Sequence, residues 1–171
     1  MPLNVDLSIF GSRQAGVALY AVAMARFLED KEAANVICPD HWSAHFSKPT
    51  VCSPPLRFRN AVLFRHPDWS RQLGRGGRLY CPHDRLALGV RDQVITLHDT
   101  LPYVYPTRNP VEWLYYRALL PSCIHRLSGV FTVSETSKKD IIDRFGLAPS
   151  KVHLVPNGID LDIWSRGHYP D

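Results

Sequence analysis

Hydrophobic positions follow two periodicities that alternate along the chain. Short runs rich in β-branched and aromatic residues are typical of buried strands, and they occur at residues 3–10, 35–38, 78–81, 93–97, 129–133 and 151–155. Between them, apolar residues recur every three or four positions, which predicts helices over 17–29, 110–127 and 138–145. The alternation predicts an α/β fold with a mainly parallel sheet and helices on both faces. We expect at least four strands, and in our interpretation six or more.

Individual residues mark the ends of two helices. Pro110 suits a first helical turn, and Pro121 should kink or split the 110–127 helix because proline lacks an N–H. Ser134–Ser137 is rich in N-capping side chains, and Gly146 suits the end of the following helix. We expect loops over residues 39–55 and 100–109, and partly helical structure over 61–73.

Composition limits the class of protein. The chain has 171 residues, of which 45% are hydrophobic and 21% charged, as in a soluble globular domain. It shows neither a signal peptide nor an apolar run approaching the ~18 residues of a membrane span. The four cysteines are widely separated and lack C-x-x-C spacing. We therefore expect reduced thiols in a cytosolic protein and no metal site.

The net charge of +4 has a local origin. Six arginines lie between residues 57 and 78 against one acid, Asp68, and aromatic residues are interleaved with them. One interpretation is an ordinary solvated surface. The other is a surface for anionic lipid head groups or a phosphorylated acceptor, with Arg57, Arg59, Arg65 and Trp69 as candidates. No nucleic-acid-binding motif accompanies the charge, so we expect no nucleic-acid partner.

Polar clusters follow the predicted strands. They are Gly11–Gly16, His83-Asp84, His98-Asp99, Ser134–Ser137 and Asn157-Gly158. The carboxyl ends of parallel strands share one edge of a sheet, where open α/β sheets bind ligands. We therefore expect these sequence-distant clusters to converge on one crevice.

His98 and Asp99 are the candidate catalytic residues. They end a buried strand, and burying both unpaired would be costly. A neutral imidazole can exchange a hydrogen bond with a substrate hydroxyl, and a carboxylate can orient it. In the alternative interpretation Asp99 caps the following loop and His98 bonds a backbone carbonyl. His83-Asp84 looks similar but follows a weaker strand.

Gly16 is a candidate for phosphate contact. It opens a helix directly after a strand, and a glycine there lets an anion approach the helix N-terminus. The spacing is neither the dinucleotide fingerprint nor a P-loop, and a tight turn would also require glycine. A small hydrolase using His98 and Asp99 is a further alternative, although no G-x-S-x-G elbow surrounds Ser134.

Four segments together resemble a known family. Val94–Asp99, Gly129–Ile141 and Lys151–Asp160, with the turn and helix at Gln14–Tyr20, are similar to the N-terminal domain of family-4 retaining glycosyltransferases. These enzymes have the two-lobed GT-B fold. The resemblance covers about residues 3–162, which we expect to form the N-terminal Rossmann-like domain. Residues 163–171 would begin the linker to a C-terminal lobe that is absent here.

The resemblance implies a division of labour between the lobes. The N-terminal lobe binds a glycan or lipid-linked acceptor, and the C-terminal lobe provides most contacts to the nucleotide-sugar, a co-substrate; no cofactor is implied. Carried over by position, Gly16 would lie near the donor phosphates and His98 beside the transferred sugar, where it stabilises developing charge. Ser134, Asn157 and Gly158 would line the cleft. Ala15 replaces a glycine that many relatives have, which weakens the expected phosphate contact.

The expected function is therefore that of half an enzyme. The complete protein would transfer a sugar in the cytoplasm, with peripheral contact at the inner face of the membrane, and this fragment alone would be inactive. Trp42, Tyr103 and Tyr105 in the predicted loops suit stacking against sugar rings. The alternative is a Rossmann-like binding or interaction domain without catalysis.

Overall fold

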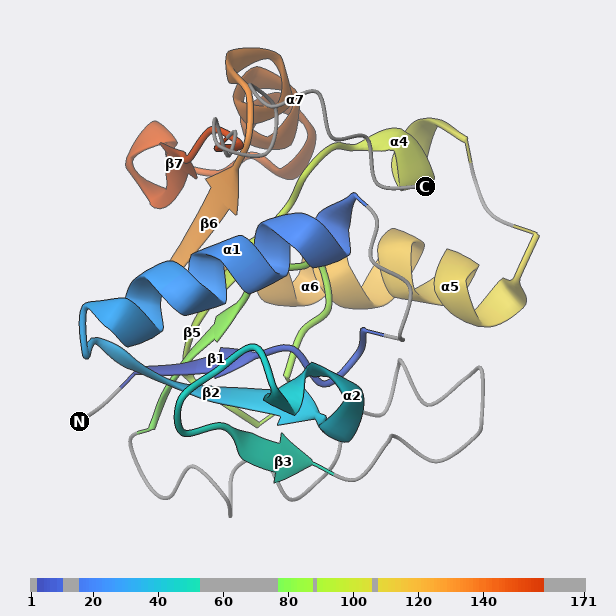
Figure 1. Ribbon diagram of the computed structural model, residues 1–171. Helices are drawn as coiled ribbons and strands as arrows, with labels where there is room; N and C mark the ends of the chain where they lie inside the picture. Colours follow the sequence, from blue (N-terminus) through green and yellow to red (C-terminus); the bar gives the residue numbers. More distant parts are fainter. Residues whose placement is uncertain (1–2, 11–15, 53–76, 88, 106–107, 159–171) are drawn as a thin grey trace, which may run out of the picture.

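A computed structural model describes residues 3–10, 16–52, 77–87, 89–105 and 108–158 (Figure 1). Seven strands form one sheet in the order β3-β2-β1-β4-β5-β6-β7, and every neighbouring pair is parallel. The strands are β1 (Leu3–Asp6), β2 (Ala34–Pro39), β3 (Thr50–Cys52), β4 (Arg78–Cys81), β5 (Asp92–Thr96), β6 (Gly129–Thr132) and β7 (Val152–Leu154). The predicted Rossmann-like α/β fold is confirmed.

Helices cover both faces of this sheet. They are α1 (Val17–Asp30), α2 (Asp40–Ser43), α4 (Leu101–Val104), α5 (Pro110–Leu114), the π-helical turn η1 (Tyr115–Leu119), α6 (Leu120–Ile124), α7 (Glu135–Phe145) and the 3-10 turn η2 (Pro149–Lys151). In Figure 1, α1 crosses in front of the strands, whereas α5 and α6 lie behind them.

Alternation along β4 shows how the sheet separates two cores. Leu79 and Cys81 point into a core built with η1, α6 and α7. Tyr80, between them, points to the opposite side and packs with α1. Because successive strand residues face opposite sides, a strand buried on both faces needs an unbroken apolar run. This explains why the central strands read as continuous hydrophobic segments.

Several short elements differ from the predictions. β1 ends at Asp6 rather than Phe10, because the Asp6 carboxylate accepts the Ser8 N–H and the Phe10 N–H bonds the Leu7 carbonyl, which closes a turn. Both predicted loops contain regular structure: α2 and β3 lie within 39–55, and α4 within 100–109. These elements have three or four residues, too few to show a period in the sequence.

The helix predicted over 110–127 is divided, as Pro121 indicated. The Leu120 N–H bonds the Tyr115 carbonyl, five residues back, so the turn before the proline is π-helical. Proline has no N–H and its ring crowds the preceding turn, which favours such a widened turn. As a result the consecutive residues Tyr115 and Tyr116 are both buried.

The ends of α7 follow its predicted caps. Ser134 accepts a hydrogen bond from the Ser137 N–H, and Gly146 closes the helix in a left-handed conformation with φ of 62°. The helix starts at Glu135, three residues before the predicted Lys138. The predicted helix over 61–73, the arginine-rich surface with Arg57, Arg59, Arg65 and Trp69, and the linker over 163–171 lie outside the described residues.

Candidate functional site

His98 lies just past β5, at the carboxyl edge of the sheet. Its half-buried ring contacts Tyr20 of α1 at right angles, with the ring centroids 4.8 Å apart and an interplanar angle of 85°. The backbone of Pro82 hydrogen-bonds the imidazole. Nε2 is buried without a partner among the described residues. A neutral ring with its proton on Nδ1, toward Pro82, would leave the lone pair of Nε2 for a donor.

Burial keeps this imidazole neutral. Desolvation is the main cause that lowers the pKa of His98 below its ordinary value of 6.5. The hydrogen bond to Pro82 and the negative charges of Asp84 and Asp99 act in the opposite direction and are weaker. Near pH 7 the ring is therefore neutral rather than a cation.

A chain of hydroxyl groups anchors Tyr20. Its OH lies 3.2 Å from the Tyr80 OH and 3.5 Å from Thr96 Oγ1, and the last two atoms are 2.8 Å apart. Tyr80 and Thr96 are buried in β4 and β5, and burial raises the pKa of Tyr80 far above its usual range. The three hydroxyl groups therefore form one hydrogen-bonded chain between α1 and the sheet.

The start of α7 holds the main chain of His98. The Ser137 Oγ donates to the His98 carbonyl at 2.9 Å, and the Ser134 Oγ donates to the Ser137 Oγ at 3.0 Å. Two predicted site residues, Ser134 and His98, are thus brought together through a serine that the predictions did not single out as functional. The cap motif was recognisable in the sequence, but its contact with a residue 39 positions away was not.

Asp99 points into the following turn. Its carboxylate accepts the Leu101 N–H at 2.8 Å, next to the start of α4, and the residue is exposed. This is the geometry of the alternative interpretation, in which Asp99 caps the next loop. A catalytic role for Asp99 stays a prediction.

Gly16 and Asn157-Gly158 lie at the same edge but make no described contact with His98. Gly16 has φ of 51°, and a Cβ there would meet no atom within 4 Å. Its positive φ therefore requires glycine, whereas crowding does not. Asn157 and Gly158 are exposed and follow β7, the second strand along the sheet from β5. Their expected contacts with a donor stay predictions.

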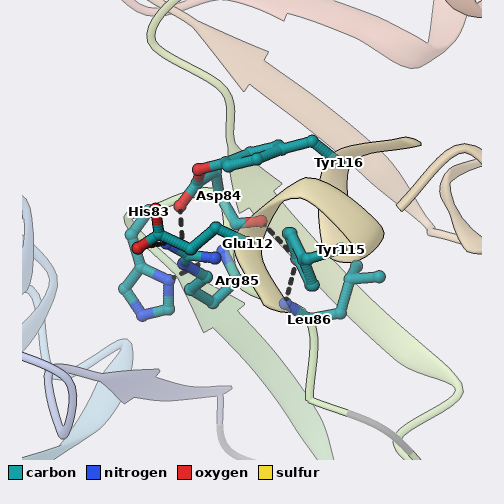
Figure 2. Close-up of polar contacts among 7 residues, drawn as sticks. All are labelled: His83, Asp84, Arg85, Leu86, Glu112, Tyr115 and Tyr116. Carbon is teal, nitrogen blue, oxygen red and sulfur yellow. Dashed lines mark hydrogen bonds and ion pairs between the residues drawn. The ribbon is translucent and has the colours of Figure 1, made fainter. Parts of the chain in front are cut away.

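The loop after β4 carries a polar cluster around Asp84 (Figure 2). The sequence indicated a site at His83-Asp84 less strongly than at His98-Asp99. The Tyr115 OH donates to the Asp84 carbonyl at 2.6 Å and accepts the Leu86 N–H at 2.9 Å. The Tyr116 OH donates to Asp84 Oδ2. Both tyrosines of the π-helical turn therefore bind the same loop.

Arg85 completes this cluster. Its guanidinium lies 3.4 Å from Asp84 Oδ1 and 3.8 Å from Glu112 Oε1, and it covers the rings of Tyr115 and Tyr116 at 4.9 and 5.3 Å from their centroids. Its side chain is only 13% exposed, a setting in which charge pairing and cation–π contact matter. The cluster fixes the loop that contains Pro82, and Pro82 in turn bonds His98.

Asp6, Cys81 and His83 form a second buried group, with their ligand atoms within 4.8 Å of one another. Such a set could hold a transition metal. However, the main-chain N–H of Arg85 donates to Nδ1 of His83 at 3.1 Å. This bond occupies the lone pair of Nδ1 and places the ring proton on Nε2. A protonated Nε2 is a donor and not a ligand, so this geometry suits hydrogen bonding. The expected absence of a metal stays a prediction.

The aromatic residues expected to stack on sugars divide into two groups. Trp42 is 2% exposed and belongs to the core beside α1. Tyr103 is 7% exposed and packs against Tyr116 and Phe145. The expectation is wrong for both, because their rings fill the core. Tyr105, with 73% exposed, remains accessible.

Comparisons with known proteins identify the family of this chain. None of the described helices has the length and hydrophobicity needed to cross a membrane. The chain is 26% identical over 172 residues to the O-antigen chain mannosyltransferase RfbU of Salmonella typhimurium; the match covers 91% of this chain but 48% of that protein, so the chain spans about half the length of this relative. Residues 15–163 match Glycosyltransferase Family 4, which includes the helix of Tyr20, the His98 edge and the Asn157 turn. The chain therefore belongs to Glycosyltransferase Family 4.

Proposed function

We propose that this chain is the acceptor-side half of a retaining GT-B glycosyltransferase. The complete protein would move a hexose, with mannose the first candidate, from a nucleotide-sugar to a growing polysaccharide or lipid-linked oligosaccharide. The family match over residues 15–163 carries the proposal. The mannosyltransferase relative, half of whose length this chain covers, supports both the sugar and a second lobe.

In this proposal His98 contacts the transferred sugar. The lone pair of Nε2 accepts a hydrogen bond from a sugar hydroxyl, because the neutral ring holds its proton on Nδ1 toward Pro82. A fixed dipole at the reaction centre stabilises charge that develops as the nucleotide leaves. Gly16 would lie near the donor phosphates, with Ser134, Asn157 and Gly158 along the cleft. No cofactor is needed for this role.

Turnover by the complete gene product tests this function. It should transfer label from one of a panel of GDP- and UDP-sugars to an oligosaccharide acceptor, and NMR should show the anomeric configuration of the donor retained. The 171-residue chain alone should show no turnover and no micromolar donor binding. Transfer with inversion would contradict the retaining mechanism. Absence of transfer from every donor would favour the non-catalytic binding domain.

The cellular location belongs to the same proposal. We place the enzyme in the cytoplasm, at the inner face of the membrane, through the arginine-rich surface of Arg57, Arg59, Arg65 and Trp69. Binding of the chain to vesicles with anionic lipids should then fall steeply as salt rises from low to physiological concentration. Binding that ignores salt, or no binding, would remove the membrane contact and leave the transferase proposal intact.

A further inference from the structure

Tyr20 of α1 contacts Gly16 through its main chain and the ring of His98 through its side chain. Its N–H donates to the Gly16 carbonyl at 3.3 Å, the first hydrogen bond of α1. Its ring contacts the imidazole at 4.8 Å between centroids. Gly16 precedes α1 and His98 follows β5, so nothing in the local sequence fixes the distance between them.

The tyrosine is itself held at its far end. Its OH reaches both Tyr80 and Thr96, whose own hydroxyl groups bond each other in β4 and β5. The ring is therefore fixed at the backbone by the helix and at the hydroxyl by the sheet. A ring with both ends fixed can act as a rigid support for its neighbour, because few rotamers satisfy both contacts.

The imidazole needs such a support. The Pro82 backbone bonds the ring and Ser137 bonds the His98 carbonyl, so only one of these two contacts acts on the imidazole itself. A perpendicular aromatic neighbour restricts that rotation. It also excludes water from one side of the ring.

We propose that Tyr20 is a positioning residue: it holds His98 in the orientation and tautomer that present Nε2 to the sugar, and it sets the place of His98 relative to the Gly16 turn. The inference rests on the proposed function for the sugar contact only. The orientation of the imidazole can be measured without any substrate.

The first experiment measures His98 in the 171-residue chain by ¹H–¹⁵N NMR of the imidazole nitrogens, with assignment from a His98→Gln variant. The unmodified chain should show the tautomer with the proton on Nδ1. Tyr20→Leu should mix the two tautomers, and the pKa of His98 should rise toward 6.5 as water reaches the ring. Tyr20→Phe keeps the ring but loses the hydroxyl anchor, so its change should be smaller.

Asp84, Asp99 and the Pro82 backbone, the other groups that act on the imidazole, are unchanged in both variants. Phe10→Leu is the matched control, because Phe10 makes the same kind of perpendicular contact with His83. It should change the resonances of His83 and leave the pKa of His98 in place. Should Tyr20→Leu fail to fold, Tyr20→Met refills the space without an aromatic ring and gives the same two outcomes.

The second experiment uses the complete gene product. Tyr20→Leu should lower kcat by about tenfold or more with little change in donor KM, because a misplaced group costs turnover rather than binding. An unchanged tautomer and pKa of His98 in a folded Tyr20→Leu chain would overturn the proposal. Altered NMR behaviour without glycosyl transfer by any form of the enzyme would instead retain Tyr20 as the support of His98 and reject the proposed function.

Discussion

Two neighbouring loops at the same edge of the sheet use their polar residues differently. After β4, Asp84 and Arg85 are bound to Tyr115, Tyr116 and Glu112 in one internal cluster. After β5, His98 is held by its main chain and one ring nitrogen, while Nε2 is left without a partner among the described residues. The first loop is cross-linked by several contacts, whereas the second holds a buried ring nitrogen that pairs with no described group. The difference is one of degree, because Nη1 of Arg85 in the first loop also lacks a partner among the described residues.

Breaking the first loop should have the largest effect on stability. Asp84→Ala leaves Arg85 and Tyr116 without their nearest partner in a mostly buried site, and we expect a loss of about 3 kcal/mol in the free energy of unfolding. Urea denaturation of the chain measures it. Asp92→Ala removes a comparable pair with Arg78, but there the side chains are 45% and 60% exposed, so the loss should be below about 1 kcal/mol. Equal losses would refute the contrast between a buried and an exposed pair.

Changing the second loop should affect turnover more than stability. We expect His98→Ala to reduce kcat of the complete enzyme by about a hundredfold, because one preorganised polar group at the reaction centre is lost. The midpoint of urea unfolding should fall less than in Asp84→Ala, because the half-buried ring loses one aromatic contact and one hydrogen bond but leaves no buried charge unpaired. Asp99→Asn, whose carboxylate caps the Leu101 N–H, should cost less turnover. A larger loss for Asp99→Asn would make Asp99 the principal catalytic residue of the pair.

The same difference should be visible in the pH dependence. The folded pKa of His98 lies below the unfolded value near 6.5. As the pH falls through 6.5, the folded chain therefore binds fewer protons than the unfolded chain does. The free energy of unfolding should therefore decrease as the pH falls from 6.5 to the folded pKa. Above pH 6.5 the ring is neutral in both states, so His98 adds no pH dependence there. His98→Gln should remove that part of the slope, which urea titrations at several pH values would reveal. A slope that is unchanged in His98→Gln would assign the titration to other histidines.

The two loops also differ in how far the sequence predicts them. The strand ending in His98, the cap at Ser134 and the stop at Gly146 depend on neighbours within a few positions, and they could be predicted. Pro121 likewise predicted a break in its helix. The π-helical turn and its contacts with the β4 loop could not be predicted, because Tyr115 and Tyr116 meet Asp84 across 31 and 32 residues.

Burial was the second property that local pattern failed to predict. Trp42 and Tyr103 lie in proline-rich segments without a clear period, yet both belong to the core. An aromatic residue in such a segment looks available for a ligand until the packing of the segment is known. The short elements α2 and α4, which place these two rings, arise from that tertiary packing.

The smallest expected effect lies where the two functions meet, at the contact between α7 and His98. Ser137→Ala removes the hydrogen bond to the His98 carbonyl and should cost about 1 kcal/mol of stability, since the Ser137 N–H still bonds Ser134. If the carbonyl contact also orients the imidazole, turnover should fall by a few-fold more than in Ser122→Ala, a control whose hydroxyl bonds the Ala118 carbonyl within its own helix. Equal turnover in the two variants would mean that the ring is held by Tyr20 and Pro82 alone, and that α7 stabilises the edge without directing its chemistry.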